Sequence, residues 1–325
     1  MSDGNALKLF SGTSHREFTE RVASYLGTEV SEALVDRFSD GEVHVEIQTS
    51  VRDSDVFVLQ SLSDPVNDHL VELLAMIDAV RRSSAASVTA VVPYFGYARQ
   101  DRQPKPRTPV TAKLVADMLE TAGVSRVVAV DLHASQIQGF FTRPLEHLFA
   151  APVFQSAIRE LDIAGEGLVI VSPDTGGVDR ARHYSSVLDA PLAILDKRRS
   201  VPNQSEVMNV IGEVEGRHVV IVDDMVDTAG TLSRAAEVLD DRGAEEVDAV
   251  ATHPVLSGPA VERLDQSPLD TLLVTDTIPL DGRAEQSDTL DVISVDELVG
   301  EAIHRIHGGI SVSSIFDTHP QRSSG

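Results

Sequence analysis

The segment Val220–Thr231, with the sequence VIVDDMVDTAGT, decides the fold of this chain more than any other stretch. An apolar run leads into two adjacent carboxylates, Asp223 and Asp224, and a turn of small residues follows before a helical pattern begins. This order places the turn at a helix N-terminus, where free backbone N–H groups and the helix dipole favour an anion. Neighbouring carboxylates can accept hydrogen bonds from hydroxyl groups, so the segment suits a sugar phosphate. The alternative is an ordinary strand, turn and helix with an acidic cap.

Short apolar, β-branched runs alternate with helix-periodic segments along the chain. The expected strands lie at residues 55–60, 88–92, 127–131, 168–171, 192–195, 219–222, 247–251 and 272–274, and the expected helices at residues 66–82, 110–122, 177–188, 230–242 and 295–306. Strands separated by helices indicate βαβ units and mostly parallel sheets, which bind ligands at the carboxyl ends of their strands. We therefore expect an α/β fold.

An internal repeat indicates two related domains. Residues 111–133 align with residues 231–253, and a threonine, a glycine and a histidine recur at equivalent places in both copies. Shared βα chemistry is the alternative explanation of these matches. We expect an N-terminal domain at residues 1–150, a C-terminal domain at residues 151–317 and a frayed polar tail at residues 318–325.

Composition excludes several classes of protein. The chain has 325 residues with 42% hydrophobic content and no tryptophan. It also has no cysteine, so disulfides and thiolate metal sites are excluded. A net charge of −24 argues against nucleic-acid binding, because phosphate backbones need a basic surface. No apolar run approaches the roughly 18 residues of a membrane span, and the start MSDGNALKLF lacks the pattern of a secretion signal. We expect a cytoplasmic protein without a membrane or nucleic-acid partner.

The acid excess accompanies a scarcity of lysine. Only four lysines, Lys8, Lys105, Lys113 and Lys197, stand against 23 arginines. Acidic, lysine-poor surfaces are typical of halophilic proteins, in which salt screens self-repulsion. A GC-rich genome that prefers arginine codons explains the same composition equally well.

Six segments together resemble one enzyme family. RFSDGE begins at Arg37, PYFGYARQDR at Pro93, DLHASQIQGFF at Asp131, SPDTGGVDRAR at Ser172 and DKRR at Asp196, and Val220–Thr231 completes the set. In this order they resemble ribose-phosphate diphosphokinase of the common bacterial class I, from about Lys8 to Phe316. The resemblance implies two tandem type I phosphoribosyltransferase-like domains, each with a mostly parallel central sheet flanked by helices.

The resemblance implies transfer of the β,γ-diphosphate of Mg-ATP to the C1 hydroxyl of ribose 5-phosphate. The products are 5-phosphoribosyl 1-diphosphate and AMP, for nucleotide, histidine and tryptophan biosynthesis. The transferred group carries several negative charges, so its transition state needs cations placed in advance. By resemblance, Lys197 and Arg199 supply them. A solvated basic cluster is the alternative.

The same resemblance assigns the substrate contacts. ATP would bind Phe38, Asp40, Gly41, Glu42, Arg99 and Gln100, and ribose 5-phosphate would bind Arg199, Asp223, Asp224, Asp227, Thr228, Ala229, Gly230 and Thr231. The adenine contacts from RFSDGE would come across a subunit interface, although the segment by itself reads as a plain turn. The commoner family pattern has glycine where this chain has Ala229. Alanine fits only if its φ is negative and no close backbone approach is needed there, so we expect weaker binding of the phosphate but not lost binding.

The resemblance also implies Mg²⁺, with His133 and Asp174 as metal-associated residues. Asp174 is an oxygen ligand of the kind that Mg²⁺ prefers, whereas His133 suits a metal-bound water or a phosphate better. A packed histidine after a strand is the alternative for His133, and its repeat counterpart His253 is undecided.

Two other functions compete with this one. A phosphoribosyltransferase would share the loop but would not need tandem domains or an ATP lid, and a catalytically silent regulatory paralogue would have altered catalytic positions. The family further implies a homohexamer, inhibition by ADP and activation by phosphate.

Overall fold

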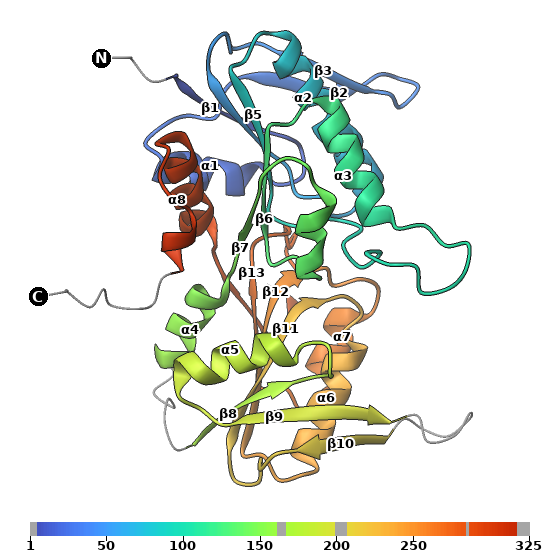
Figure 1. Ribbon diagram of the computed structural model, residues 1–325. Helices are drawn as coiled ribbons and strands as arrows, with labels where there is room; N and C mark the ends of the chain where they lie inside the picture. The colour runs from blue at the N-terminus through green and yellow to red at the C-terminus, as the bar shows by residue number, and fades with distance from the viewer. Residues whose placement is uncertain (1–4, 161–166, 199–206, 284–285, 317–325) are drawn as a thin grey trace, which may run out of the picture. The chain divides into compact units, whose positions relative to one another are not determined.

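The computed structural model describes residues 5–160, 167–198, 207–283 and 286–316, and it divides into two compact units (Figure 1). Unit 1 comprises residues 1–149 and 295–325, and unit 2 comprises residues 150–294. Each unit has its own sheet and core. None of the helices in the described ranges is both long and apolar enough to cross a membrane.

Unit 1 is built on a five-stranded parallel sheet in the order β1-β4-β5-β6-β7. These strands are β1 (Leu7–Ser11), β4 (Asp55–Leu59), β5 (Ser87–Val92), β6 (Arg126–Val130) and β7 (Leu145–Leu148). A separate antiparallel pair contains β2 (Ala33–Arg37) and β3 (Val43–Ile47). The helical elements are α1 (Arg16–Tyr25), α2 (Val66–Arg82), α3 (Thr111–Ala122), the 3₁₀ helix η1 (Ser135–Phe140), α8 (Asp296–His307) and the 3₁₀ helix η3 (Ser313–Ile315).

Side chains of the unit 1 strands alternate between two helical layers, as the two-residue period of a strand requires. Val56 and Val58 of β4 join the cluster beneath α2 and α3. Helices α1 and α8 pack together, and Figure 1 shows them across the sheet from α2 and α3. The predicted helix at residues 66–82 is confirmed at both ends, with its apolar side buried.

Helix α8 belongs to unit 1, which differs from the expected C-terminal domain of residues 151–317. It packs on α1, where Tyr25 hydrogen-bonds to Glu301 and Arg21 pairs with Asp296. The chain first passes from unit 1 to unit 2 between residues 149 and 150, one residue before the expected boundary. The tail at residues 318–325 lies outside the described part of the chain.

Unit 2 has a seven-stranded sheet in the order β10-β9-β8-β11-β12-β13-β14, parallel except for the edge strand β10. Its strands are β8 (Leu168–Ser172), β9 (Leu192–Arg198), β10 (Val207–Ile211), β11 (His218–Val226), β12 (Glu246–Pro254), β13 (Thr271–Thr275) and β14 (Leu290–Ile293). Its helices are α4 (Ala151–Glu160), α5 (Val178–Leu188), α6 (Gly230–Asp240) and α7 (Ala260–Asp265).

The two units contain the same βαβ arrangement at the places that the repeat predicts. β5, α3 and β6 follow one another in unit 1 as β11, α6 and β12 do in unit 2, and in both units the two strands are parallel neighbours. The α/β fold with mostly parallel sheets is therefore confirmed. In each unit, the loops at the carboxyl ends of the parallel strands lie at one edge of the sheet, which is where ligands bind in such folds.

Candidate functional site

In unit 2, Asp223 and Asp224 lie on β11, which continues past its expected end at Val222 to Val226. Asp224 is buried, and its backbone N–H donates to Oδ1 of Asp223 at 2.8 Å. Nη1 of Arg180 lies 3.3 Å from Oδ1 of Asp224 and 3.6 Å from Oδ1 of Asp223. The two carboxylates thus form a pair that one guanidinium contacts from α5.

The acid pair has unusual proton affinity. Burial, followed by the charge of Asp224 and a hydrogen bond to it, raises the pKa of Asp223 to about 7, although Arg180 acts in the opposite direction. Near neutral pH both the protonated and the ionised forms of Asp223 are therefore populated, and a ligand that donates hydroxyl hydrogen bonds or brings positive charge favours the ionised form.

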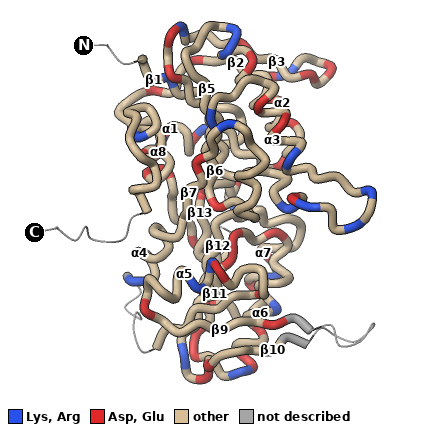
Figure 2. The backbone as a smooth tube through the Cα atoms, viewed as in Figure 1, with Lys and Arg blue, Asp and Glu red and all other residues tan. Residues whose placement is uncertain are grey.

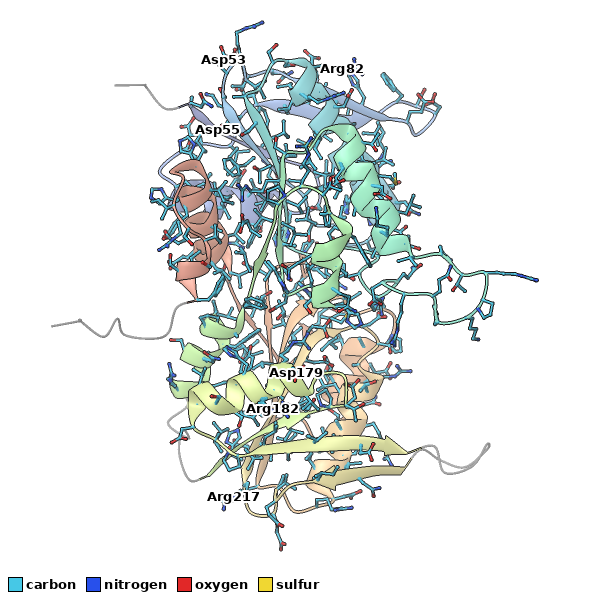
Figure 3. The ribbon with its side chains drawn as sticks, in the orientation of Figure 1. Asp53, Asp55, Arg82, Asp179, Arg182 and Arg217 are labelled. Carbon is cyan, nitrogen blue, oxygen red and sulfur yellow. The ribbon has the colours of Figure 1, made fainter. Side chains whose placement is uncertain are left out.

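Sequence reasoning assigned no role to Arg180, although it lies in the quoted SPDTGGVDRAR segment. Its neighbours on α5 show that the contact is selective. Arg182 and Asp179 pair with each other at 3.5 Å, and their side chains are 66% and 98% exposed (Figure 3). Only knowledge of how α5 packs against β11 identifies Arg180 as the arginine that reaches the carboxylates.

Residues 227–231, which we call the phosphate loop after their predicted role, follow β11 and include the start of α6. Ala229 has a φ of +60° and is 4% exposed, so the negative φ on which the fit of alanine was expected to depend is not found. A left-handed conformation costs a residue with a Cβ about 1–2 kcal/mol, so the surrounding structure must hold the loop in place. Helix α6 begins at Gly230, and its first turn closes with a hydrogen bond from Ser233 N–H to Ala229 O at 2.9 Å. The loop therefore lies at a helix N-terminus, as predicted.

Asp174 follows β8 and has a fixed orientation. Its Oδ1 accepts the backbone N–H groups of Gly176 at 2.8 Å and Gly177 at 2.9 Å. Across the described ranges, no three His, Asp or Glu side chains are arranged to hold a metal ion.

The predicted catalytic cations are only partly within the described residues. Lys197 belongs to β9 by its backbone, which pairs with Met208 of β10, but its side chain lies outside the described part. Arg199 lies outside it entirely. Their roles stay predictions.

In unit 1, the predicted adenine contacts form the turn between β2 and β3. Phe38 N–H donates to Glu42 O and Gly41 N–H donates to Phe38 O, both at 2.9 Å, while Glu42 N–H donates to Oδ1 of Asp40 at 3.1 Å. The Phe38 side chain is 52% exposed, and its ring centroid lies 4.7 Å from that of His44. The turn thus leaves Phe38 about half exposed beside His44.

Arg99 and Gln100 line a cavity of about 540 Å³ in unit 1. Its other lining residues are Asp64, Pro65, Val66, Asn67, Asp68, Tyr94, Gly96 and Tyr97. Gln100 is oriented by Thr111, whose hydroxyl donates to Oε1 at 2.6 Å. Beyond them, the segment before α3 carries Arg102, Lys105 and Arg107, and Figure 2 shows basic residues along this loop.

His133 is exposed just after β6, in unit 1, whereas Asp174 belongs to unit 2. His147 fixes the start of its loop, because its Nε2 accepts the N–H of Leu132 at 2.9 Å. The repeat counterpart His253 differs, since it is 2% exposed and its Nδ1 lies 2.9 Å from the hydroxyl of Thr277. Burial of His253 favours a structural role for it.

Comparisons with known proteins cover nearly the whole chain. A sequence profile of the N-terminal domain of ribose phosphate pyrophosphokinase matches residues 7–123, and a profile of the phosphoribosyl synthetase-associated domain matches residues 183–317. A ribose-phosphate pyrophosphokinase of Fusobacterium nucleatum is 50% identical over 98% of this chain and 100% of its own length. A ribose-phosphate pyrophosphokinase of Caldanaerobacter subterraneus is 52% identical over 96% of this chain and 98% of its own length.

A solved structure agrees with these relatives. The crystal structure of phosphoribosylpyrophosphate synthetase from Mycobacterium smegmatis matches with a TM-score of 0.89 and 40% identity, covering 94% of this chain and 100% of that chain. By sequence and by fold, this chain belongs to the ribose-phosphate pyrophosphokinase family.

Proposed function

We propose that this protein is a ribose-phosphate pyrophosphokinase, transferring the β,γ-diphosphate of ATP to the C1 hydroxyl of ribose 5-phosphate. The observation that carries the proposal is the joint position of the acid pair and the phosphate loop on β11 and the start of α6. A phosphate and the hydroxyls of one small sugar fit that arrangement together. Membership of the family, at about half identity over nearly the full length, supports the same reaction.

Each part of unit 2 has a role in this proposal. The N–H groups of the phosphate loop bind the 5-phosphate, as backbone amides at a helix N-terminus do for anions. Asp223 and Asp224 accept hydrogen bonds from the ring hydroxyls, which orients C1. Lys197 and Arg199 stabilise the charge that develops on the transferred diphosphate, and loss of one such group costs about 10²–10³ in rate.

The ATP contacts are proposed from unit 1. The exposed ring of Phe38 stacks on the adenine, and the polar groups of Asp40, Gly41 and Glu42 contact its edge. Arg99 and Gln100 bind the phosphates and ribose from the wall of their cavity.

Mg²⁺ is the proposed metal, with Asp174 as an oxygen ligand and His133 in contact with bound water or phosphate. When bound, it neutralises phosphate charge and orients the diphosphate for displacement. Transfer of the diphosphate changes no oxidation state, so the metal acts through its charge alone.

A ³¹P NMR experiment with purified protein, ATP, Mg²⁺ and ribose 5-phosphate tests the proposal. AMP and a C1-linked diphosphate should appear together, and Lys197→Ala should slow their formation about 10²-fold or more while the protein stays folded. Intact ATP would favour the silent paralogue. Release of diphosphate only from phosphoribosyl diphosphate plus a base would favour a phosphoribosyltransferase.

The assembly and its regulation are proposed on the same basis. A cytoplasmic homohexamer, with adenine contacts shared between subunits, should lose activity when it is diluted to monomers. Light scattering combined with the rate assay measures this, and ADP and phosphate are then added as effectors. Full activity from a monomer would contradict a shared adenine site.

A further inference from the structure

Three consecutive carbonyl groups, on residues 226–228, are hydrogen-bonded to the segment that follows β12. The first two accept the backbone N–H groups of Leu256 at 2.9 Å and of Ser257 at 2.8 Å. The third, on Thr228, accepts Nη1 of Arg263 at 2.9 Å. Two of these bonds are made by backbone and survive most substitutions, whereas the third depends on one side chain of α7.

The segment that makes these bonds is itself fixed. The guanidinium of Arg283 donates to the carbonyls of Val255 and Leu256 at 3.3 Å each, of Leu280 at 2.9 Å and of Pro279 at 3.1 Å. The hydroxyl of Ser233 on α6 donates to the Arg263 carbonyl at 3.4 Å. The phosphate loop is therefore held by a braced segment.

These bonds determine where the N–H groups of the loop point. In a planar trans peptide, the C=O of one residue and the N–H of the next point in opposite directions. Carbonyls 226–228 turned toward the α7 segment therefore turn the N–H groups of residues 227–229 to the opposite side. Successive N–H groups on one side form an anion-binding concavity, and Ala229 occupies the left-handed conformation there.

Arg263 also brings positive charge to a loop preceded by acidic side chains. Its Nη1 lies 3.7 Å from the position that a Cβ on Gly230 would occupy, so the guanidinium lies against the loop beside the start of α6. Within the described residues, it is a cation that contacts the backbone of this loop directly.

We propose that Arg263 is a positioning residue for the 5-phosphate of ribose 5-phosphate. It holds the Thr228 carbonyl so that the loop keeps its N–H groups on one side, and it supports the left-handed conformation of Ala229. The inference rests on the proposed function, in which this loop binds the 5-phosphate. No motif in the sequence identifies Arg263, because its role depends on the approach of α7 to the loop.

Steady-state kinetics of Arg263→Gln test the inference. Loss of a hydrogen bond from a charged group should raise KM for ribose 5-phosphate about tenfold or more. KM for ATP and kcat at saturating ribose 5-phosphate should stay within about twofold, since a general loss of structure would change all three together. Arg263→Lys should restore part of the affinity. The matched control is Arg234→Gln on α6, which removes an exposed arginine paired with Glu237 and should change neither KM.

A double-mutant cycle with Ala229→Gly isolates the positioning role. Glycine adopts a positive φ without strain, so the loop should depend less on Arg263. In the wild-type and in the Ala229→Gly background, the factor by which Arg263→Gln raises KM for ribose 5-phosphate is measured. That factor should be at least about threefold lower in the Ala229→Gly background. If Arg263→Gln does not fold, Arg263→Lys in the same two backgrounds provides the cycle.

The possible failures are distinguishable. A wild-type protein that forms no phosphoribosyl diphosphate overturns the proposed function and this inference with it. An active wild type whose KM for ribose 5-phosphate is unchanged in Arg263→Gln overturns the inference alone. If Arg263→Gln lowers kcat and raises the KM values for ATP and ribose 5-phosphate by similar factors, Arg263 only stabilises the fold. That result also overturns the inference.

Discussion

Replacement of Asp223 by asparagine should stabilise the protein, and the gain should grow with pH. Burial and the neighbouring Asp224 raise the pKa of Asp223 from an ordinary 3.8 to about 7, although Arg180 opposes the shift. The unfolded chain titrates near the ordinary value, so the folded state binds this proton more tightly between about pH 4 and pH 7. Stability therefore falls as pH rises through that window, and the penalty is complete above the folded pKa.

The size of the gain follows from the shift. The pKa of Asp223 rises from 3.8 to about 7, which is about three pH units. Each unit corresponds to about 1.36 kcal/mol, so the gain in the free energy of unfolding has an upper limit of about 4 kcal/mol. The Asp223 side chain is 29% exposed, so solvent screens part of this penalty and we expect about 1–3 kcal/mol above pH 7. Asparagine keeps the shape of the side chain and removes its charge. Activity should fall because one of the two oxygens that accept hydroxyl hydrogen bonds becomes an amide N–H donor.

Thermal and urea unfolding at about pH 5.5 and about pH 8, without ligands and at one ionic strength, measure this effect. The gain in the free energy of unfolding from Asp223→Asn should be larger at the higher pH by about 1–2 kcal/mol. Each kcal/mol should appear as a rise of about 2–4 °C in Tm. Asp291→Asn, at an exposed site on β14 in the same unit, is the control. An equal gain at both pH values, or a loss at the higher one, would refute the reasoning about the acid pair.

Three further predictions concern other parts of the molecule. Gly96→Ala places a Cβ 2.5 Å from the carbonyl oxygen of Leu62, so it should cost about 1–3 kcal/mol in urea unfolding, whereas Gly139→Ala, with nothing within 4 Å, should cost less than about 1 kcal/mol. Burial opposes protonation of His218, but the hydrogen bond and charge of Asp248 outweigh it and raise its pKa above 6.5. The resulting stability is present below the unfolded pKa and is lost as pH rises through the folded one, so His218→Gln should destabilise more near pH 6 than near pH 9. If the net charge of −24 is a salt adaptation, Tm and turnover should rise toward about 1 M KCl, and steady decline from dilute buffer would favour the codon explanation.

The local pattern of apolar residues was sufficient to predict the bounds of elements that bury one side. Helix α2 begins and ends where its apolar period predicted, and the helix–strand repeat matches neighbouring elements in both sheets. Strand β11 instead continues four residues past its expected end, because Met225 and Val226 find partners on β12 at His253 and Pro254. Strand length here depends on pairing between residues far apart in sequence, which apolar runs do not reveal.

The return of the C-terminal helix to unit 1 was not predicted, for a related reason. The periodicity at residues 295–306 identified a helix but could not identify the surface that covers it. Helix α8 returns to unit 1, where His307 lies 3.0 Å from Asp55 at the start of β4, labelled in Figure 3. An amphipathic pattern specifies that a face must be buried, and only the complete fold specifies against what.

Ala229 shows why the site was harder to predict than the fold. Motif and composition correctly placed small residues at the start of α6, but the intrinsic preference of alanine gave the wrong sign of φ. The bonds to residues 226–228 from the α7 segment outweigh that preference, and these bonds join parts of the chain about 30 residues apart. Strain of this kind persists where the surroundings over-determine a backbone, and such places are often functional sites. A phosphate loop whose N–H groups must converge therefore depends on contacts that its own motif does not encode, and Arg263 is the member of that set that a single substitution can test.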